Sequence, residues 1–245
     1  MKREVERAAD AAPLDFAIIK ACEAVSHNLN GQKLGAKGRL TRERIIRAAI
    51  ETLTSDDDEA LTLSAVARRA SLGMSALYIY FNDLSELMLA VLEPVMAVAD
   101  TTVFDTIREH WPDELLEKRS RAFLTAYRNF WHTHARLLHQ RNRLSDAGDD
   151  PMLVHRIAAA QPLVDLLCFQ LGLGDLEEAG RETDAMARVL VICIERTMTA
   201  ETGPLYKKFA QSVDAQRSFD LAEASARLIE ITIRDSRAVL NNQRR

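Results

Sequence analysis

The stretch T-L-S-A-V-A-R-R-A-S-L-G-M-S-A-L-Y-I-Y-F, residues 62–81, decides the fold expected for this chain. In its first half, apolar residues recur at the three- and four-residue spacing of one helix face: Leu63, Val66, Ala67 and Ala70. Gly73 interrupts the pattern, and a second short helix is predicted from about Met74 to Phe81. Two short helices joined by a three-residue turn form a helix-turn-helix, whose second helix can lie in the major groove of DNA. Because many helical cores contain such a pair without touching DNA, geometry alone leaves both interpretations open.

The neighbouring sequence predicts a helix on each side of this pair. Thr41 is expected to cap a preceding helix, and Thr62 to cap the first helix of the pair. Asp83 with Glu86 three residues later is typical of a capping box that starts a following helix. Only 9 glycines and 6 prolines occur in 245 residues, too few for the turns of an all-β chain, so an all-α fold is expected.

Residues 62–87, together with the preceding G-R-L-T-R-E-R-I-I-R-A-A at 38–49, closely resemble the DNA-binding signature of the tetracycline-repressor (TetR) family. The similarity covers about residues 38–92. It implies a homodimer of all-α subunits, each with a three-helix helix-turn-helix DNA-binding head and a larger helical ligand-binding and dimerisation body. On this basis we expect an N-terminal extension and basic arm at 1–38, a DNA-binding domain at 39–83, a joining helix at about 84–103 and a body at 104–245.

The resemblance also assigns roles within the head. Thr62 and Ser64 would contact DNA phosphates, and six further residues would lie on or near the recognition helix: Met74, Ser75, Ala76, Tyr78, Ile79 and Tyr80. The chain departs from the usual pattern in having Ser71 at the common turn glycine and no charged residue in the recognition helix. Base readout would therefore depend on hydroxyl groups and on apolar contact with thymine methyl groups.

Positive charge is concentrated just before the pair, although the whole chain carries a net charge of −4. Residues 33–47 contain six basic residues and one acidic residue, a net charge of +5. Glycines at 31, 35 and 38 predict a flexible arm over 31–40. Four residues are expected to contact the phosphate backbone or a neighbouring minor groove: Lys37, Arg39, Arg42 and Arg44.

The body contains one stretch that mixes aromatic and polar side chains on a helix face. Core packing explains such a face as well, but ligand pockets also combine apolar walls with a few polar groups. We expect an effector site lined by Phe123, Tyr127, Phe130, Trp131, His134 and Leu138, with Arg141, Asn142, Met152, His155 and Cys168 as weaker candidates.

Two further helices, at about 177–200 and 218–240, carry apolar stripes and are expected to form a four-helix dimer interface. The stripes comprise Met186, Val189, Leu190 and Cys193 in one helix, and Ala222, Ala226, Ile229 and Ile233 in the other. Pro94 is expected to kink or end the joining helix.

Other functions lack their motifs. The chain has no G-x-S-x-G, P-loop or H-E-x-x-H sequence, so we expect neither an enzyme nor a cofactor. His132 and His139 would lie about 10 Å apart on a helix, too far to share a metal ion. Three scattered cysteines, no N-terminal signal and no apolar run of about 18 residues predict a cytoplasmic protein outside the membrane.

The leading hypothesis is a ligand-responsive transcriptional regulator, most simply a repressor released from a palindromic double-stranded DNA operator by a small apolar or aromatic molecule. The alternative is a helical dimer that binds a small molecule or a partner and has lost specific DNA recognition.

Overall fold

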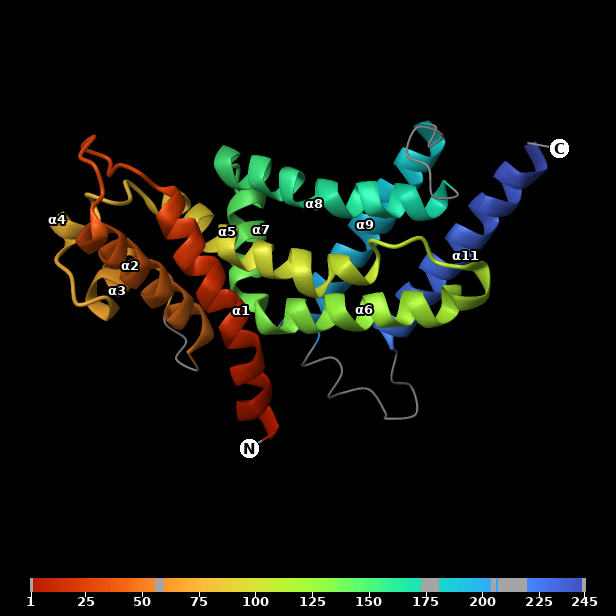
Figure 1. Ribbon diagram of the computed structural model, residues 1–245, viewed down its shortest axis with the longest axis horizontal. Coiled ribbons are helices and arrows are strands. Elements are labelled where there is room, and N and C mark those ends of the chain that lie inside the picture. The colour runs from red at the N-terminus through yellow and green to blue at the C-terminus, as the bar shows by residue number, and fades with distance from the viewer. Residues whose placement is uncertain (1, 56–59, 173–180, 204–205, 207–219, 244–245) are drawn as a thin grey trace. The chain divides into compact units, whose positions relative to one another are not determined.

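The computed structural model is an all-α protein, as predicted (Figure 1). It describes residues 2–55, 60–172, 181–203, 206 and 220–243. Among these residues no strand occurs, and the one β-bridge, between His27 and Lys33, is isolated. The α-helices are α1 (Lys2–Ala24), α2 (Ala36–Thr54), α3 (Leu63–Arg69), α4 (Met74–Leu77), α5 (Leu84–Thr102), α6 (Leu116–Thr133), α7 (Ala135–Asp146), α8 (Asp150–Leu171), α9 (Arg181–Thr202) and α11 (Leu221–Gln243).

The chain divides into two compact units. The first comprises Met1–Val98 with Arg136–Arg156, and the second comprises Ala99–Ala135 with Ile157–Arg245. The first unit therefore contains α7 and the start of α8 in addition to the predicted head.

The N-terminal extension is helical, and the predicted flexible arm over 31–40 is wrong. Helix α1 continues through Pro13 and packs on α2. Helix α2 begins at Ala36, so Thr41 is not its cap: the Thr41 hydroxyl instead donates a hydrogen bond to the carbonyl of Lys37 within the helix. Of the three glycines taken as breakers, Gly35 immediately precedes α2 and Gly38 lies in its first turn. At Gly38 a Cβ atom would approach the tip of the Leu34 side chain to 2.7 Å, so a larger residue would require that side chain to move.

The helix-turn-helix forms as the sequence predicts, with a shorter second helix. The Thr62 hydroxyl accepts a hydrogen bond from the Ala65 amide at 3.1 Å and so caps α3. Helix α4 ends at Leu77, and Tyr78, Ile79 and Tyr80 continue as turns. The predicted cap of α5 is also present, because the Asp83 carboxylate accepts a hydrogen bond from the Glu86 amide at 2.8 Å.

The turn between α3 and α4 contains the one non-glycine residue with positive φ in the described chain, Ser71 at 53°. This left-handed conformation brings Cβ close to the backbone of an L-residue and costs about 1 kcal/mol or more. Glycine removes that cost, which accounts for the glycine usual at this turn.

We expect Ser71→Gly to raise the free energy of unfolding by about 1 kcal/mol, measured by urea denaturation. The matched control is Ser75→Gly: Ser75 is also exposed but lies within α4, where glycine costs backbone entropy and should destabilise. If both changes shift stability in the same direction, the left-handed turn does not explain the effect.

Helix α5 does not end at Pro94 but runs on to Thr102, close to the predicted 84–103. By length and composition, Leu84–Thr106 and Asp150–Leu171 would each suffice to cross a membrane. In the first helix, 61% of the most apolar 18-residue stretch is buried inside the protein, as in the core helix of a soluble protein. In the second helix, 28% of the corresponding stretch is buried. Two such helices are weak evidence for a membrane span.

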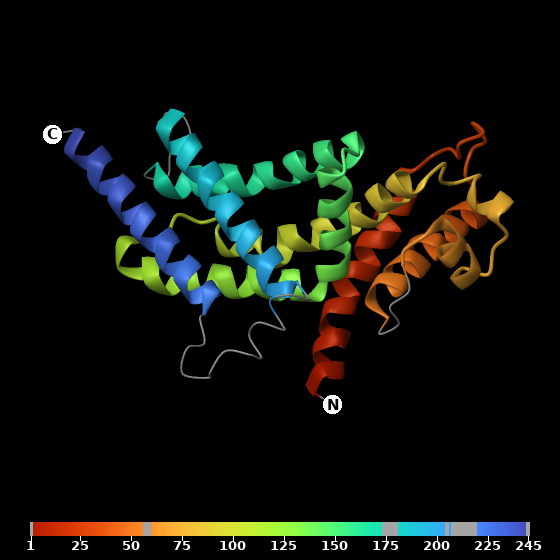
Figure 2. The ribbon, with the colours of Figure 1, turned by 180° about the vertical axis from the view of Figure 1, so that it is seen from behind.

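In the second unit, α6, α9 and α11 pack against one another (Figure 2). The alanine-containing stripe on α11 that was predicted to contact a second subunit is buried within the single chain, so that assignment is wrong. Its members are Ala222, Ala226, Ile229 and Ile233. Leu190 of the α9 stripe is also buried, whereas Met186, Val189 and Cys193 are exposed. The predicted interface residues 177–180 and 218–219 lie outside the described residues.

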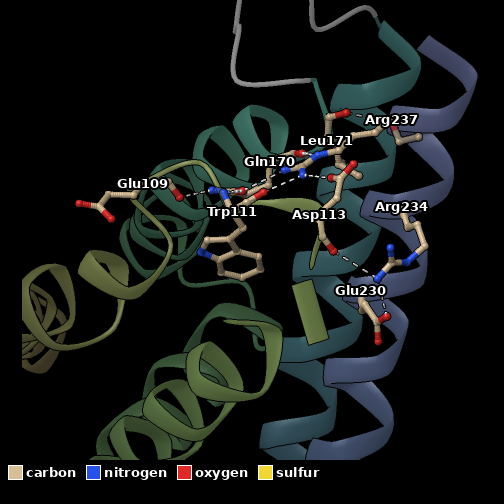
Figure 3. Close-up of polar contacts among 9 residues, drawn as sticks. Glu109, Trp111, Asp113, Gln170, Leu171, Glu230, Arg234 and Arg237 are labelled. Atoms are coloured by element: carbon tan, nitrogen blue, oxygen red, sulfur yellow. Dashed lines mark hydrogen bonds and ion pairs between the residues drawn. The ribbon is translucent and has the colours of Figure 1, made fainter. Parts of the chain in front are cut away.

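A buried polar network fixes the segment between α5 and α6 (Figure 3). This segment contains two short 3-10 helices, Phe104–Thr106 and Asp113–Leu115. The residues between them are irregular, so their backbone groups need hydrogen-bond partners when buried. Gln170 of α8 supplies them: its amide nitrogen donates to the carbonyls of Ile107 and Glu109 at 2.9 and 2.8 Å, and its amide oxygen accepts from the Trp111 amide at 3.0 Å. Gln170 thus replaces the partners that a helix would have provided.

Arg237 of α11 completes the same network (Figure 3). Only 2% of Arg237 is exposed. Its guanidinium donates to the carbonyls of Gln170 and Trp111 at 2.9 and 2.7 Å, and to the Asp113 carboxylate at 2.6 Å. Through these bonds α8, α11 and the irregular segment are tied together.

Candidate nucleic-acid interface

The recognition helix α4 presents a small polar surface above a closed apolar core. Leu77 and Phe81 are fully buried. Ser75 is exposed, and 49% of Tyr78 is exposed. Because Leu77 and Phe81 pack into the core, the exposed side chains of Ser75 and Tyr78 lie on the solvent side. Their hydroxyl groups can donate and accept hydrogen bonds.

The remaining predicted recognition residues are less accessible. Met74, Ala76, Ile79 and Tyr80 are partly exposed. Thr62 and Ser64 are exposed at the start of α3, where their hydroxyl groups lie 3.1 Å apart. Residues at a helix N-terminus suit phosphate oxygens, since free backbone amides and the helix dipole favour negative charge.

The four predicted basic contacts fall into two groups. Lys37 and Arg44 are exposed on α2, whereas Arg39 and Arg42 are half-buried. The Arg42 guanidinium lies 4.6 Å from the centre of the Phe81 ring, a cation–π contact. Burial lowers the pKa of Arg42 from its ordinary value, with nearby acidic groups partly offsetting the effect. Arg42 therefore supports the core of the first unit, and Lys37 and Arg44 offer the more accessible charges.

The sequence-based argument missed an ordered turn next to α4. Residues 26–34 form a hydrogen-bonded turn, and the amide of Leu29 donates to the carbonyl of Ile79 at 3.1 Å. Gly31 in this turn has φ +74°, which glycine adopts without strain. The Asn30-Gly31 pair is a turn signal that predicts such a structure.

The predicted effector residues divide between the two units. In the second unit, five lie on or just after α6, namely Phe123, Tyr127, Phe130, Trp131 and His134, and Cys168 lies on α8. The first unit contains the other five: Leu138, Arg141, Asn142, Met152 and His155. The face was expected to lie on one helix, but α6 ends at Thr133 and α7 begins at Ala135, so the single-helix interpretation is wrong.

The α6 part of this set is an aromatic stripe. Phe123 and Tyr127 have ring centres 5.9 Å apart, and Tyr127 and Trp131 have ring centres 6.4 Å apart. All three side chains are buried. Burial lowers the pKa of His134, which follows α6, to about 4, so its imidazole is neutral near pH 7.

The weaker candidates show a similar electrostatic pattern. Burial, and then the charge of Arg141, lower the pKa of His155 to about 4. The Arg141 guanidinium donates to the side-chain oxygen of Asn142 at 2.9 Å. Among the residues that the structure describes, no group of three histidine, cysteine, aspartate or glutamate side chains is placed to hold a metal ion.

These features define the chain as a helix-turn-helix protein. No protein-family model matches the chain. A segment of 61 residues, 25% of the chain, is 38% identical to an uncharacterized HTH-type transcriptional regulator, TtgW, of Pseudomonas putida. The match covers 46% of that protein's length. The similarity is therefore to part of a protein named as a helix-turn-helix transcriptional regulator.

Proposed function

We propose that the chain is a ligand-responsive transcriptional regulator of the TetR type, a repressor that leaves a palindromic operator when a small apolar or aromatic molecule binds. The observation that carries the proposal is the capped helix-turn-helix, in which Ser75 and Tyr78 are exposed over the buried Leu77 and Phe81. The similarity to a helix-turn-helix regulator supports the same function. An operator on chromosomal DNA implies a cytoplasmic protein.

Sequence readout in this proposal comes from the outward face of α4 and from the turn that follows it. The Tyr78 and Ser75 hydroxyl groups hydrogen-bond base edges, and Met74 and Ile79 contact thymine methyl groups. Because α4 carries no charge, it cannot pair an arginine with guanine. The phosphate backbone is contacted mainly by four residues: Lys37, Arg44, Thr62 and Ser64. Four less accessible residues make further contacts with the DNA: Arg39, Arg42, Ala76 and Tyr80.

The homodimer is proposed to form through α9 and α11. Each helix has exposed apolar side chains: Met186, Val189 and Ile192 on α9, and Leu228, Ile231 and Val239 on α11. Large apolar side chains in contiguous exposed stripes mark interaction surfaces. A twofold dimer would place two recognition helices in successive major grooves about 34 to 36 Å apart.

The effector is proposed to bind among the buried aromatic side chains of α6 and the neutral His134 that follows it, which suit an uncharged or aromatic molecule. A ligand changes operator affinity only if it binds the DNA-free conformation better than the DNA-bound one. A near-complete switch requires a difference of several kcal/mol in ligand binding.

The function is tested by DNA binding over a series of salt concentrations. The full-length protein should bind a duplex that it selects from a random-sequence pool, with two chains per site. In Lys37→Gln/Arg44→Gln, the slope of log affinity against log salt concentration should fall by about 1 for each lost phosphate contact. Affinity near 0.15 M salt should fall about 30-fold per subunit by the same relation.

The matched control is Lys118→Gln/Arg119→Gln, which removes two exposed positive charges from α6 in the second unit. It should leave the salt slope unchanged. Failure of the wild-type protein to select any duplex, even at low salt, would refute the DNA-binding function. In that case the chain would instead be a helical dimer that binds a small molecule or a partner without specific DNA recognition. The absence of charge in α4 is the observation that favours this alternative function.

A further inference from the structure

The turn at residues 26–34, here called the N-terminal turn, is a rigid element. The amide of Leu34 donates to the carbonyl of Ser26 at 2.8 Å, and the amide of Asn28 donates to the carbonyl of Gln32 at 2.9 Å. The side-chain oxygen of Asn28 accepts hydrogen bonds from the amides of Asn30 and Gln32, at 3.0 and 2.9 Å. Such bonds stabilise the closed turn and fix the directions of the side chains around it.

One hydrogen bond holds the N-terminal turn beside the end of α4, and one apolar contact joins it to α2. The Leu29 amide is bonded to the Ile79 carbonyl, just after the end of α4. Leu34 is buried and packs over Gly38 at the start of α2. The turn therefore lies beside the end of α4.

The exposed groups of this turn are positive or neutral. No aspartate or glutamate occurs between Glu23 and Glu43. Lys33 is exposed, and so are the amide side chains of Asn30 and Gln32. His27 and Lys33 form the isolated bridge, so their side chains leave the same side of the turn. An ammonium group with neighbouring amide donors is suited to a phosphate oxygen.

The position of the turn also suggests which part of a duplex it would meet. In helix-turn-helix proteins the N-terminal residues of the recognition helix contact the bases, and contacts to the sugar-phosphate backbone lie at the groove edges. The N-terminal turn adjoins the C-terminal end of α4. It would therefore meet the backbone at the edge of the half-site rather than the bases.

We propose that the N-terminal turn is a second DNA-contacting element, in which Lys33, assisted by Asn30 and Gln32, binds a backbone phosphate flanking the half-site read by α4. The inference rests on the proposed function, because it requires a bound duplex. It adds to that function a fixed phosphate contact from the extension that precedes α2.

The experiment compares Lys33→Gln with Lys20→Gln in the full-length chain. Lys20 is also exposed and belongs to the same extension, but it lies on α1 outside the turn. Both changes remove one positive charge. The probes are a duplex selected by the wild-type protein and a random duplex of equal length, with affinity measured against salt and hydroxyl-radical footprints of the selected duplex.

We expect Lys33→Gln to lower affinity about fivefold per subunit near 0.15 M salt, to reduce the salt slope by about 1, and to shorten the footprint at its outer edges. The loss should be equal on both duplexes, since a phosphate contact carries no sequence information. Lys20→Gln should match the wild type in all three measurements.

The outcomes separate the inference from the function on which it rests. If the wild type binds DNA but Lys33→Gln behaves like Lys20→Gln, the turn does not contact the backbone and the inference fails alone. If Lys33→Gln loses affinity for the selected duplex only, the turn reads bases and the phosphate contact is refuted. If the wild type binds neither duplex, the proposed function fails, and the inference fails with it.

Discussion

Replacing Arg237 by methionine is expected to lower the free energy of unfolding by about 3 to 5 kcal/mol. The change keeps an extended apolar side chain, but it leaves the buried carbonyls of Trp111 and Gln170 without the guanidinium that now satisfies them. It also removes the buried end of the ion pair with Asp113. Urea denaturation followed by circular dichroism measures the loss.

Arg234 provides a closely matched control, because it lies one turn earlier on α11 and appears in the same network (Figure 3). Its side chain is 53% exposed and pairs with Glu230 at 3.1 Å. Glu230 is buried but also pairs with Arg227, so it keeps a cationic partner when Arg234 is removed. Because Arg234 itself is largely exposed, Arg234→Met should cost less than about 1 kcal/mol. If the two variants lost the same free energy of unfolding, burial of Arg237 would not explain its contribution to stability.

Acidification from pH 6.5 to pH 4 is expected to remove about 3 kcal/mol of stability through His134 alone. Burial lowers its pKa from 6.5 to about 4 in the folded protein. Between these values the unfolded chain binds a proton that the folded protein does not, so stability falls as the pH falls through this window. Well above pH 6.5 both states hold a neutral His134, and its contribution no longer changes.

The measurement compares the pH dependence of unfolding in the wild type and in His134→Gln. The variant should lose less stability between pH 6.5 and pH 4, whatever its stability at pH 7. His155, whose pKa burial also lowers to about 4, continues to titrate in both proteins and so cancels in the difference. Parallel curves for the two proteins would contradict a desolvated, neutral His134.

Much of the head follows from local sequence. The Thr62 cap and the capping interaction of Asp83 with Glu86 each link residues three apart, so they are visible without tertiary information. The burial of Leu77 and Phe81 likewise follows from helical periodicity. These features place α4 and its outward residues, Ser75 and Tyr78.

The errors arise where distant residues decide local structure. Gly35 and Gly38 suggested a flexible arm, but α1 and Leu34 pack on this region and make a helix from Ala36 favourable. The apolar stripe of α11 indicated an interface, and only the tertiary packing against α6 and α9 shows that the chain buries it itself. Long-range bonds such as Gln170 to Ile107 have no periodic signal at all.

The hydrogen bond from the Leu29 amide to the Ile79 carbonyl makes the contact between the N-terminal turn and the end of α4 measurable by hydrogen exchange. The Leu29 amide proton can exchange with solvent deuterium only when the N-terminal turn separates from the end of α4. Its exchange rate therefore reports the free energy of that local opening, independently of global unfolding. A single resonance in an NMR spectrum would thus follow how firmly the extension and the recognition helix are joined, with and without DNA.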